Sequence, residues 1–155
     1  MSSKRVPVTL SKELGNQINM AILAGKKYHH DVVTPESIIF QIVKNVSSVE
    51  KTLEKSGIDI EELKGFLIQY LKDYCNDQNS TFDVELSETT QEILDAAAYR
   101  AVNCGKTQID CYKFIYEAYL SEDCEINDIF EESGFDEWKF KQNVSDLEEI
   151  DDEED

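Results

Sequence analysis

A chain of 155 residues, 41% of them hydrophobic, is long enough for one domain or for two small ones that share a core. Its formal net charge is −18 at pH 7, because 33 Asp and Glu outnumber 15 Lys and Arg. Phosphates would repel such a chain, so nucleic acid and anionic membrane surfaces are disfavoured as partners. A protein surface that is basic or mixed in charge is the natural counterpart.

The first eight residues lack the apolar stretch of a secretory signal, and no run approaches the roughly 20 apolar residues that span a bilayer. The four cysteines include no Cys-x-x-Cys pair and have no close histidine, so their spacing matches no zinc template. We therefore expect a cytoplasmic protein with reduced thiols and no bound metal.

Two helices are predicted before residue 45. The first follows the cap Ser11 and ends near Tyr28, because apolar residues recur between them at steps of three and four. After the short extended piece Val32-Val33, Thr34 can cap a second helix that runs to about Lys44. The proline and glutamate that follow this cap suit the first turn of a helix.

Two further helices complete the first half. The third covers about residues 47–55 and is ended by Gly57, since glycine readily adopts the left-handed conformation that closes a helix. Asp59 and Glu62 form a capping-box-like start for the fourth, which runs to about Tyr74.

The same succession recurs in the second half. With a shift of 76 positions, Leu86-Ser87 falls on Leu10-Ser11 and Ile109-Asp110 falls on Val33-Thr34. With a shift of 77, residues 133–136 fall on residues 56–59. A duplicated unit predicts an all-α protein of about eight short helices, in two four-helix repeats related by a pseudo-twofold axis within one compact domain.

This organisation divides the chain into five segments. Residues 1–9 are an N-terminal extension, 10–75 the first repeat, 76–85 a polar connector and 86–144 the second repeat. Residues 145–155 form a low-complexity acidic run that cannot bury apolar area, so we expect a disordered linker or tail there.

Three stretches of the first repeat, Leu10-Ser11-Lys12-Glu13-Leu14, Asn19-Met20-Ala21 and residues 28–39, resemble the N-terminal domain of Clp ATPases, closest to the ClpA type. The second repeat is in register but less similar, and the resemblance covers about residues 8–144. It implies the Clp N-domain fold and a docking role: in that family the domain is a mobile appendage of a hexameric unfoldase, and it binds adaptors and substrates.

The resemblance implies that the chain belongs to an ATP-binding subunit of an ATP-dependent Clp protease. Its partners would be a ClpS-type adaptor, protein substrates and, through the full-length parent, a ClpP-type protease. ATP and magnesium would belong to the parent's ATPase rings, because this sequence has no Gly-x-x-x-x-Gly-Lys-Ser/Thr phosphate loop. We expect a non-catalytic monomer. The alternative is a free-standing regulatory protein of the same fold that binds the unfoldase or protease.

Candidate partner-binding residues lie at the joint between the first two helices. In ClpA-type domains the corresponding acidic positions contact the adaptor. In this sequence those positions are Asp31 and Glu36, and His30 and Thr34 lie beside them. The contact surface could extend to Glu85 at the start of the second repeat. We expect this joint to be exposed. The alternative is that Thr34 and Glu36 only cap the helix.

A related branch, the ClpC type, carries an equivalent glutamate in each repeat that recognises phosphorylated arginine. The first repeat keeps Glu36, whereas the second has Tyr112 at that position. This departure favours the ClpA-like interpretation.

A rival of another class is a small hydrolase that uses Cys104 or Cys111 with His29 or His30. We expect these two cysteines to be core residues instead. The aromatics of the second repeat should also be mostly core, although Trp138 or Phe140 could remain exposed as a partner contact.

Overall fold

A computed structural model describes the backbone of residues 8–73 and 84–153, and the side chains up to residue 147. These residues form eight helices and four two-residue strands. The chain order is β1 (Thr9–Leu10), α1 (Lys12–Tyr28), β2 (Val32–Val33), α2 (Pro35–Asn45), α3 (Ser47–Lys55), α4 (Ile60–Asp73), β3 (Glu85–Leu86), α5 (Glu88–Asn103), β4 (Gln108–Ile109), α6 (Cys111–Leu120), α7 (Ile126–Glu132) and α8 (Glu137–Glu153).

Local capping sets the starts of the main helices. The side chains of Ser11, Thr34, Ser87 and Asp110 each accept a hydrogen bond from the backbone N–H three residues later, at 2.9 to 3.3 Å. Asp59 caps α4 in the same way, with its Oδ1 3.1 Å from the Glu62 nitrogen. The predicted caps and the helix boundaries of the first repeat are therefore confirmed.

The strands connect the two repeats crosswise. β1 pairs in parallel with β4, and β2 pairs in parallel with β3. The Ser11 N–H donates to the Ile109 carbonyl at 2.9 Å, and at the equivalent place the Ser87 N–H donates to the Val33 carbonyl at 3.0 Å. The first strand of each repeat thus lies against the joint of the other.

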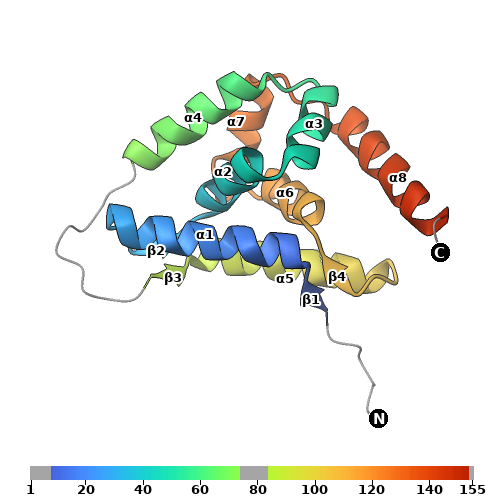
Figure 1. Ribbon diagram of the computed structural model, residues 1–155, viewed down its shortest axis with the longest axis horizontal. Helices are drawn as coiled ribbons and strands as arrows, with labels where there is room; N and C mark the ends of the chain where they lie inside the picture. Colours follow the sequence, from blue (N-terminus) through green and yellow to red (C-terminus); the bar gives the residue numbers. More distant parts are fainter. Residues whose placement is uncertain (1–7, 74–83, 154–155) are drawn as a thin grey trace, which may run out of the picture.

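Helices of the two repeats also interlock. α3 packs against α8, α7 packs against α4, and α2 meets α6 in the centre. Figure 1 shows the resulting symmetry, with α4 and α8 sloping down on opposite sides of the central helices. Because each repeat is covered by helices of the other, the two form one compact domain.

Two glycines lie where the repeats meet. Gly57 and Gly134 have φ values of 97° and 98°, and a Cβ atom built on either would lie 2.5 or 2.6 Å from the carbonyl oxygen of the other. Beside them the Asp59 N–H donates to the Ser133 carbonyl at 2.9 Å, and the Asp136 N–H donates to the Ser56 carbonyl at 2.8 Å. These reciprocal contacts place the pseudo-twofold axis between the two glycines.

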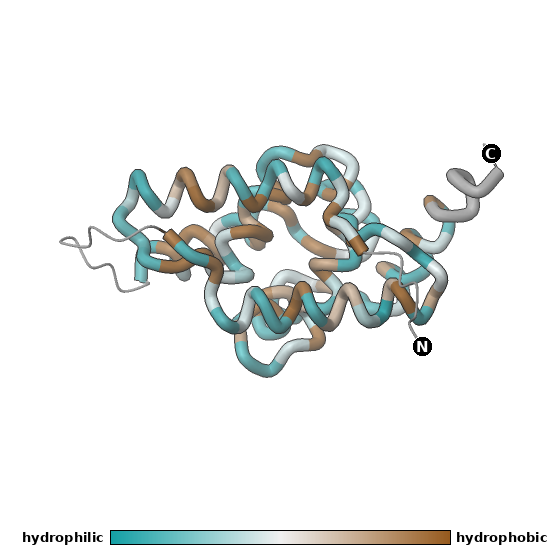
Figure 2. Tube along the Cα trace, turned by 90° about the horizontal axis from the view of Figure 1, so that it is seen from below, coloured by the Kyte–Doolittle hydropathy of each residue, from teal (hydrophilic) through white to brown (hydrophobic). Residues whose placement is uncertain are grey.

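One hydrophobic core runs through both repeats. Hydrophobic and polar residues alternate along the long helices in Figure 2, and the hydrophobic faces turn inward. In the first repeat the core is aliphatic, whereas in the second the rings of Phe130, Phe135 and Phe140 pack with centroids 5.0 to 5.3 Å apart. The predicted fold class, all-α with two related four-helix repeats, is confirmed.

The C-terminal segment differs from the prediction. α8 continues to Glu153, so the backbone is helical where we expected a disordered tail from residue 145. Glutamates favour helices, and the Gln142 amide donates to Asp146 one turn later at 3.3 Å. Local helix propensity thus acts in this segment although it buries little apolar area.

Two other predicted segments are placed only in part. Most of the connector, residues 76–83, lies outside the described residues, and Glu85 at its end belongs to β3. Thr9, assigned to the N-terminal extension, belongs to β1. Within the described residues, no helix is both long enough and apolar enough to cross a membrane.

Candidate docking surfaces

The first surface, here called the joint edge, consists of His30, Asp31 and Glu85. The β2–β3 pairing brings these residues together, since the Glu85 N–H donates to the Asp31 carbonyl at 3.2 Å. Asp31 and Glu85 are exposed, and His30 is partly buried. The structure therefore gathers two predicted carboxylates, 54 positions apart in sequence, at one acidic edge.

His29 shapes this edge. It adopts the left-handed conformation (φ 62°) at the end of α1, and the next N–H, that of His30, donates to the Gly25 carbonyl at 2.8 Å. Burial lowers the pKa of His30, and the charge of Asp31 acts in the opposite direction.

The expectation that the whole joint is exposed is wrong for Thr34 and Glu36. Thr34 is buried as the cap of α2, and Glu36 is only 1% exposed. The Glu36 Oε2 accepts a hydrogen bond from the Glu125 N–H at 2.6 Å, whereas its Oε1 is buried without a partner among the described residues. Glu36 therefore faces the segment before α7, and neither side chain is accessible to a partner in this structure.

Burial has a clear electrostatic effect on Glu36. It raises the pKa of the carboxyl group, and the hydrogen bond from Glu125 only partly offsets this. Tyr112, at the equivalent position of the second repeat, lies with its hydroxyl 3.3 Å from Thr52 Oγ1. The described structure thus offers no matched pair of accessible glutamates.

The second surface is a groove between α1, α2 and α4 with a volume of about 730 Å³, here called the first-repeat groove. Met20, Leu23 and Tyr28 of α1 and Ile68 of α4 are 40–58% exposed along it. Three lysines, Lys27, Lys44 and Lys72, also line it. Sequence reasoning missed this groove, although Met20 and Leu23 lie off the buried stripe of α1 and were a usable signal.

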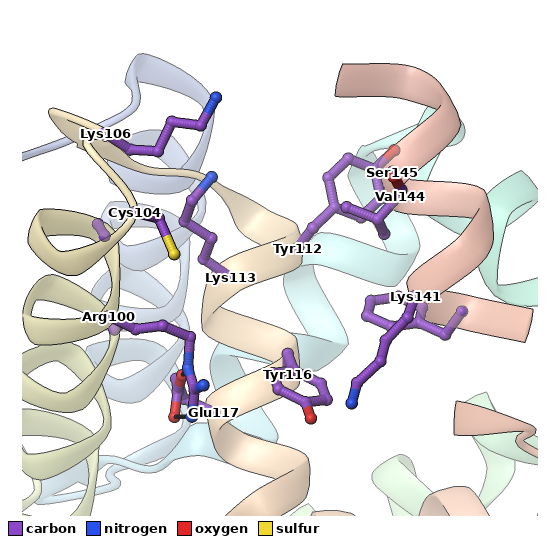
Figure 3. A pocket seen from close by; sticks show the side chains of 13 residues that line it. Arg100, Cys104, Lys106, Tyr112, Lys113, Tyr116, Glu117, Lys141, Val144 and Ser145 are labelled. Carbon is purple, nitrogen blue, oxygen red and sulfur yellow. Dashed lines mark hydrogen bonds and ion pairs between the residues drawn. The ribbon is translucent and has the colours of Figure 1, made fainter. Parts of the chain in front are cut away.

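The third surface is a smaller groove of about 220 Å³ between α5, α6 and α8, here called the second-repeat groove (Figure 3). A shift of 76 positions carries Gly25, Phe40 and Ile68 of the first groove onto Ala101, Tyr116 and Val144 of this one. The two grooves are therefore the same feature of the two repeats, and they differ in size and lining.

Cys111 and Cys124 are not activated thiols. Cys111 is 2% exposed, and burial raises its pKa to about 12; burial likewise raises the pKa of Cys124 to about 11. An activated thiol needs a lowered pKa. Cys111 is a core residue as predicted, but Cys104 is exposed, so the core assignment is wrong for it.

Two further predictions concern side-chain clusters. In the part of the chain that the structure describes, no three His, Cys, Asp or Glu side chains are grouped so that they could hold a metal ion. The aromatics divide as expected at the start of α8, where Phe140 is buried and Trp138 is 71% exposed.

These features define a class of protein: an all-helical domain of two interlocked repeats that presents grooves and a polar edge at its surface. The family comparison agrees with it. Residues 9–144 match the Clp repeat (R) N-terminal domain, and the chain belongs to that family. No curated sequence is significantly similar to the chain.

Solved structures share the fold. The N-terminal domain of Hsp104 from Candida albicans has a TM-score of 0.78 at 14% identity, over 90% of this chain and 91% of that one. The N-domain of ClpV from Vibrio cholerae has a TM-score of 0.74 at 15% identity, over 94% and 92%. The N-terminal domain of ClpD, a caseinolytic protease associated chaperone from Arabidopsis thaliana, has a TM-score of 0.68 at 14% identity, over 90% and 94%.

Proposed function

We propose that this chain is the adaptor- and substrate-docking domain of a Clp-type AAA+ unfoldase, in particular of an ATP-binding subunit of an ATP-dependent Clp protease. Membership of the Clp repeat N-terminal family supports the general role. One observation carries the proposal: the first-repeat groove exposes four large apolar side chains immediately beside the acidic joint edge. Exposed apolar grooves of this kind mark sites of protein interaction.

The joint edge and the groove are continuous at His30, which belongs to the first and lines the second. A partner could therefore place a basic side chain against Asp31 and Glu85 and an apolar side chain between α1 and α4. A ClpS-type adaptor is the partner we propose for this combined surface. Its parent would couple docking to ATP-driven unfolding and to a ClpP-type protease in the cytoplasm.

The test is a calorimetric titration of this chain with a ClpS-type adaptor at two salt concentrations. We expect binding in the micromolar range or tighter, about 8 kcal/mol or more, that weakens at higher salt. The variants Asp31→Ala and Glu85→Ala should each weaken it, and Leu23→Asp should weaken it most because it places a charge in the apolar groove.

Glu54→Ala is the matched control, because Glu54 is an exposed carboxylate of α3 outside both the joint edge and the grooves. It should bind like the parent chain. A folded sample that does not bind the adaptor would refute the adaptor assignment, and equal losses for Glu54→Ala and Asp31→Ala would refute the surface.

A further inference from the structure

Basic side chains are concentrated at the two grooves of this strongly acidic chain. Within the described residues, seven lysines and arginines line one groove or the other, whereas Glu117 is the one carboxylate that does so. The groove linings therefore carry more positive charge than the rest of the described surface, even though some carboxylates lie at their margins. Such local reversal of sign favours partners of opposite charge.

In the second-repeat groove the cations come from three helices and one connecting segment. Arg100 belongs to α5, Lys113 to α6 and Lys141 to α8, and Lys106 lies between α5 and β4. Figure 3 shows these side chains around the groove, with Tyr116 between Arg100 and Lys141. The Arg100 guanidinium carbon and the Lys141 Nζ lie 5.6 and 5.1 Å from the centre of that ring, where cation–π attraction holds them at the walls.

Carboxylates face three of the four cations. Arg100 is paired with the buried Glu117, Lys113 Nζ lies 3.5 Å from Asp110, and Lys141 Nζ lies 3.3 Å from Glu137. Lys106 forms no ion pair within the described part of the chain. The pairs of Lys113 and Lys141 are partly exposed, and solvent-exposed pairs of this kind contribute little to stability. A ligand carboxylate can therefore replace Asp110 or Glu137 at little cost.

The floor of the groove is apolar. Ala97 and Ala101 are each 1% exposed, Phe140 is 2% exposed, and Val144 and the ring of Tyr112 complete the lining. This floor fits one aliphatic or aromatic side chain, and the lysines above it fit acidic residues on either side of that chain. The first-repeat groove is larger and has Phe40 and Ser37 where this groove has Tyr116 and Lys113.

From this arrangement we infer that the second-repeat groove binds an acidic segment of a partner protein, in which carboxylates flank an apolar side chain. This second docking site does not rest on the adaptor assignment, because the joint edge lies at the groove of the other repeat. The first-repeat and second-repeat grooves thus occupy equivalent positions in the two repeats but bind different ligands. The domain can therefore hold one partner while another binds.

The test uses a fluorescent peptide in which two Glu-Glu pairs flank Leu-Phe, and a matched peptide with every Glu replaced by Gln. The acidic peptide should bind at least tenfold more tightly, and the difference should shrink as salt is added. Lys106→Gln, Lys113→Gln and Lys141→Gln should each weaken binding about two- to fivefold, and the triple variant tenfold or more.

Controls separate the groove from a general charge effect. Lys55→Gln removes an exposed lysine of α3, and Lys44→Gln removes one from the first-repeat groove; both should bind the acidic peptide like the parent. Equal affinity for the two peptides, losses for Lys55→Gln as large as those for Lys113→Gln, or no measurable binding would overturn the inference. None of these outcomes bears on adaptor binding, which is measured in a separate titration.

Steric blocking provides a second readout that does not change any lysine. Cys104 is exposed and lines the groove. In a Cys75→Ser background, a bulky maleimide on Cys104 should abolish peptide binding, whereas the same treatment of a Cys104→Ala variant should leave it intact. Retained binding after complete labelling of Cys104 would place the peptide elsewhere.

Discussion

At the scale of single residues, Glu36 links the stability of the fold to pH. Its carboxyl group is buried, one of its oxygens has no hydrogen-bond partner among the described residues, and its pKa is raised chiefly by that burial. Between the ordinary value of 4.5 and the raised native value, the folded state binds more protons than the unfolded state. The contribution of Glu36 to stability is therefore greatest at acidic pH and is lost as the pH rises through the native pKa.

The variant Glu36→Gln removes this titration. Its stability relative to the parent chain should increase between pH 4 and pH 8 by on the order of 1 kcal/mol, within the range for a buried polar group without a partner. Urea denaturation at several pH values measures the difference, and Glu54→Gln, an exposed control, should show none. If the difference in unfolding free energy between the variant and the parent is the same at pH 4 and pH 8, the pKa of Glu36 is not raised in the folded state.

Cys104 and Cys111 provide a second comparison between residues. Because Cys104 is exposed and the thiol of Cys111 is buried with a pKa raised to about 12, a maleimide at pH 7.5 should label Cys104 at least a hundredfold faster. Peptide mapping by mass spectrometry measures the two rates. Comparable labelling of Cys111 in the native protein would contradict the packing of α6.

At the scale of elements, the contact between Gly57 and Gly134 joins the two repeats. Alanine at either position must adopt a positive φ and would place its Cβ within about 2.6 Å of a backbone oxygen. Gly57→Ala and Gly134→Ala should each lower the free energy of unfolding by about 2 kcal/mol or more.

Two other glycines are matched controls. Gly15 and Gly65 lie inside α1 and α4, and a Cβ at either would meet nothing within 4 Å. Gly15→Ala and Gly65→Ala should therefore stabilise the protein by up to about 1 kcal/mol, since alanine favours helix. Thermal or urea melts of the four variants distinguish the two classes; similar effects in all four would refute the role assigned to the axis.

At the scale of the whole molecule, features that depend on residues close together in sequence could be predicted, and features that depend on residues far apart in sequence could not. Caps such as Ser11 and Asp110 act within one turn, so the helix starts and the repeat could be predicted. The burial of Glu36 could not, because it depends on Glu125, 89 positions away. The grooves were missed for the same reason, as each is built from three helices. The pairing of Asp31 with Glu85 was not predicted either, because the resemblance only named both residues as candidates and the hydrogen bond that joins them spans 54 positions.

The central claim is that the joint edge and the first-repeat groove form the docking surface of this domain. The most direct measurement is a ¹H–¹⁵N NMR titration of the labelled chain with a ClpS-type adaptor. The account predicts that the perturbed amides lie in the joint edge, α1 and α4, and that α3 is unaffected. Perturbations confined to α3 and α7, or none at all with a folded adaptor present, would contradict it.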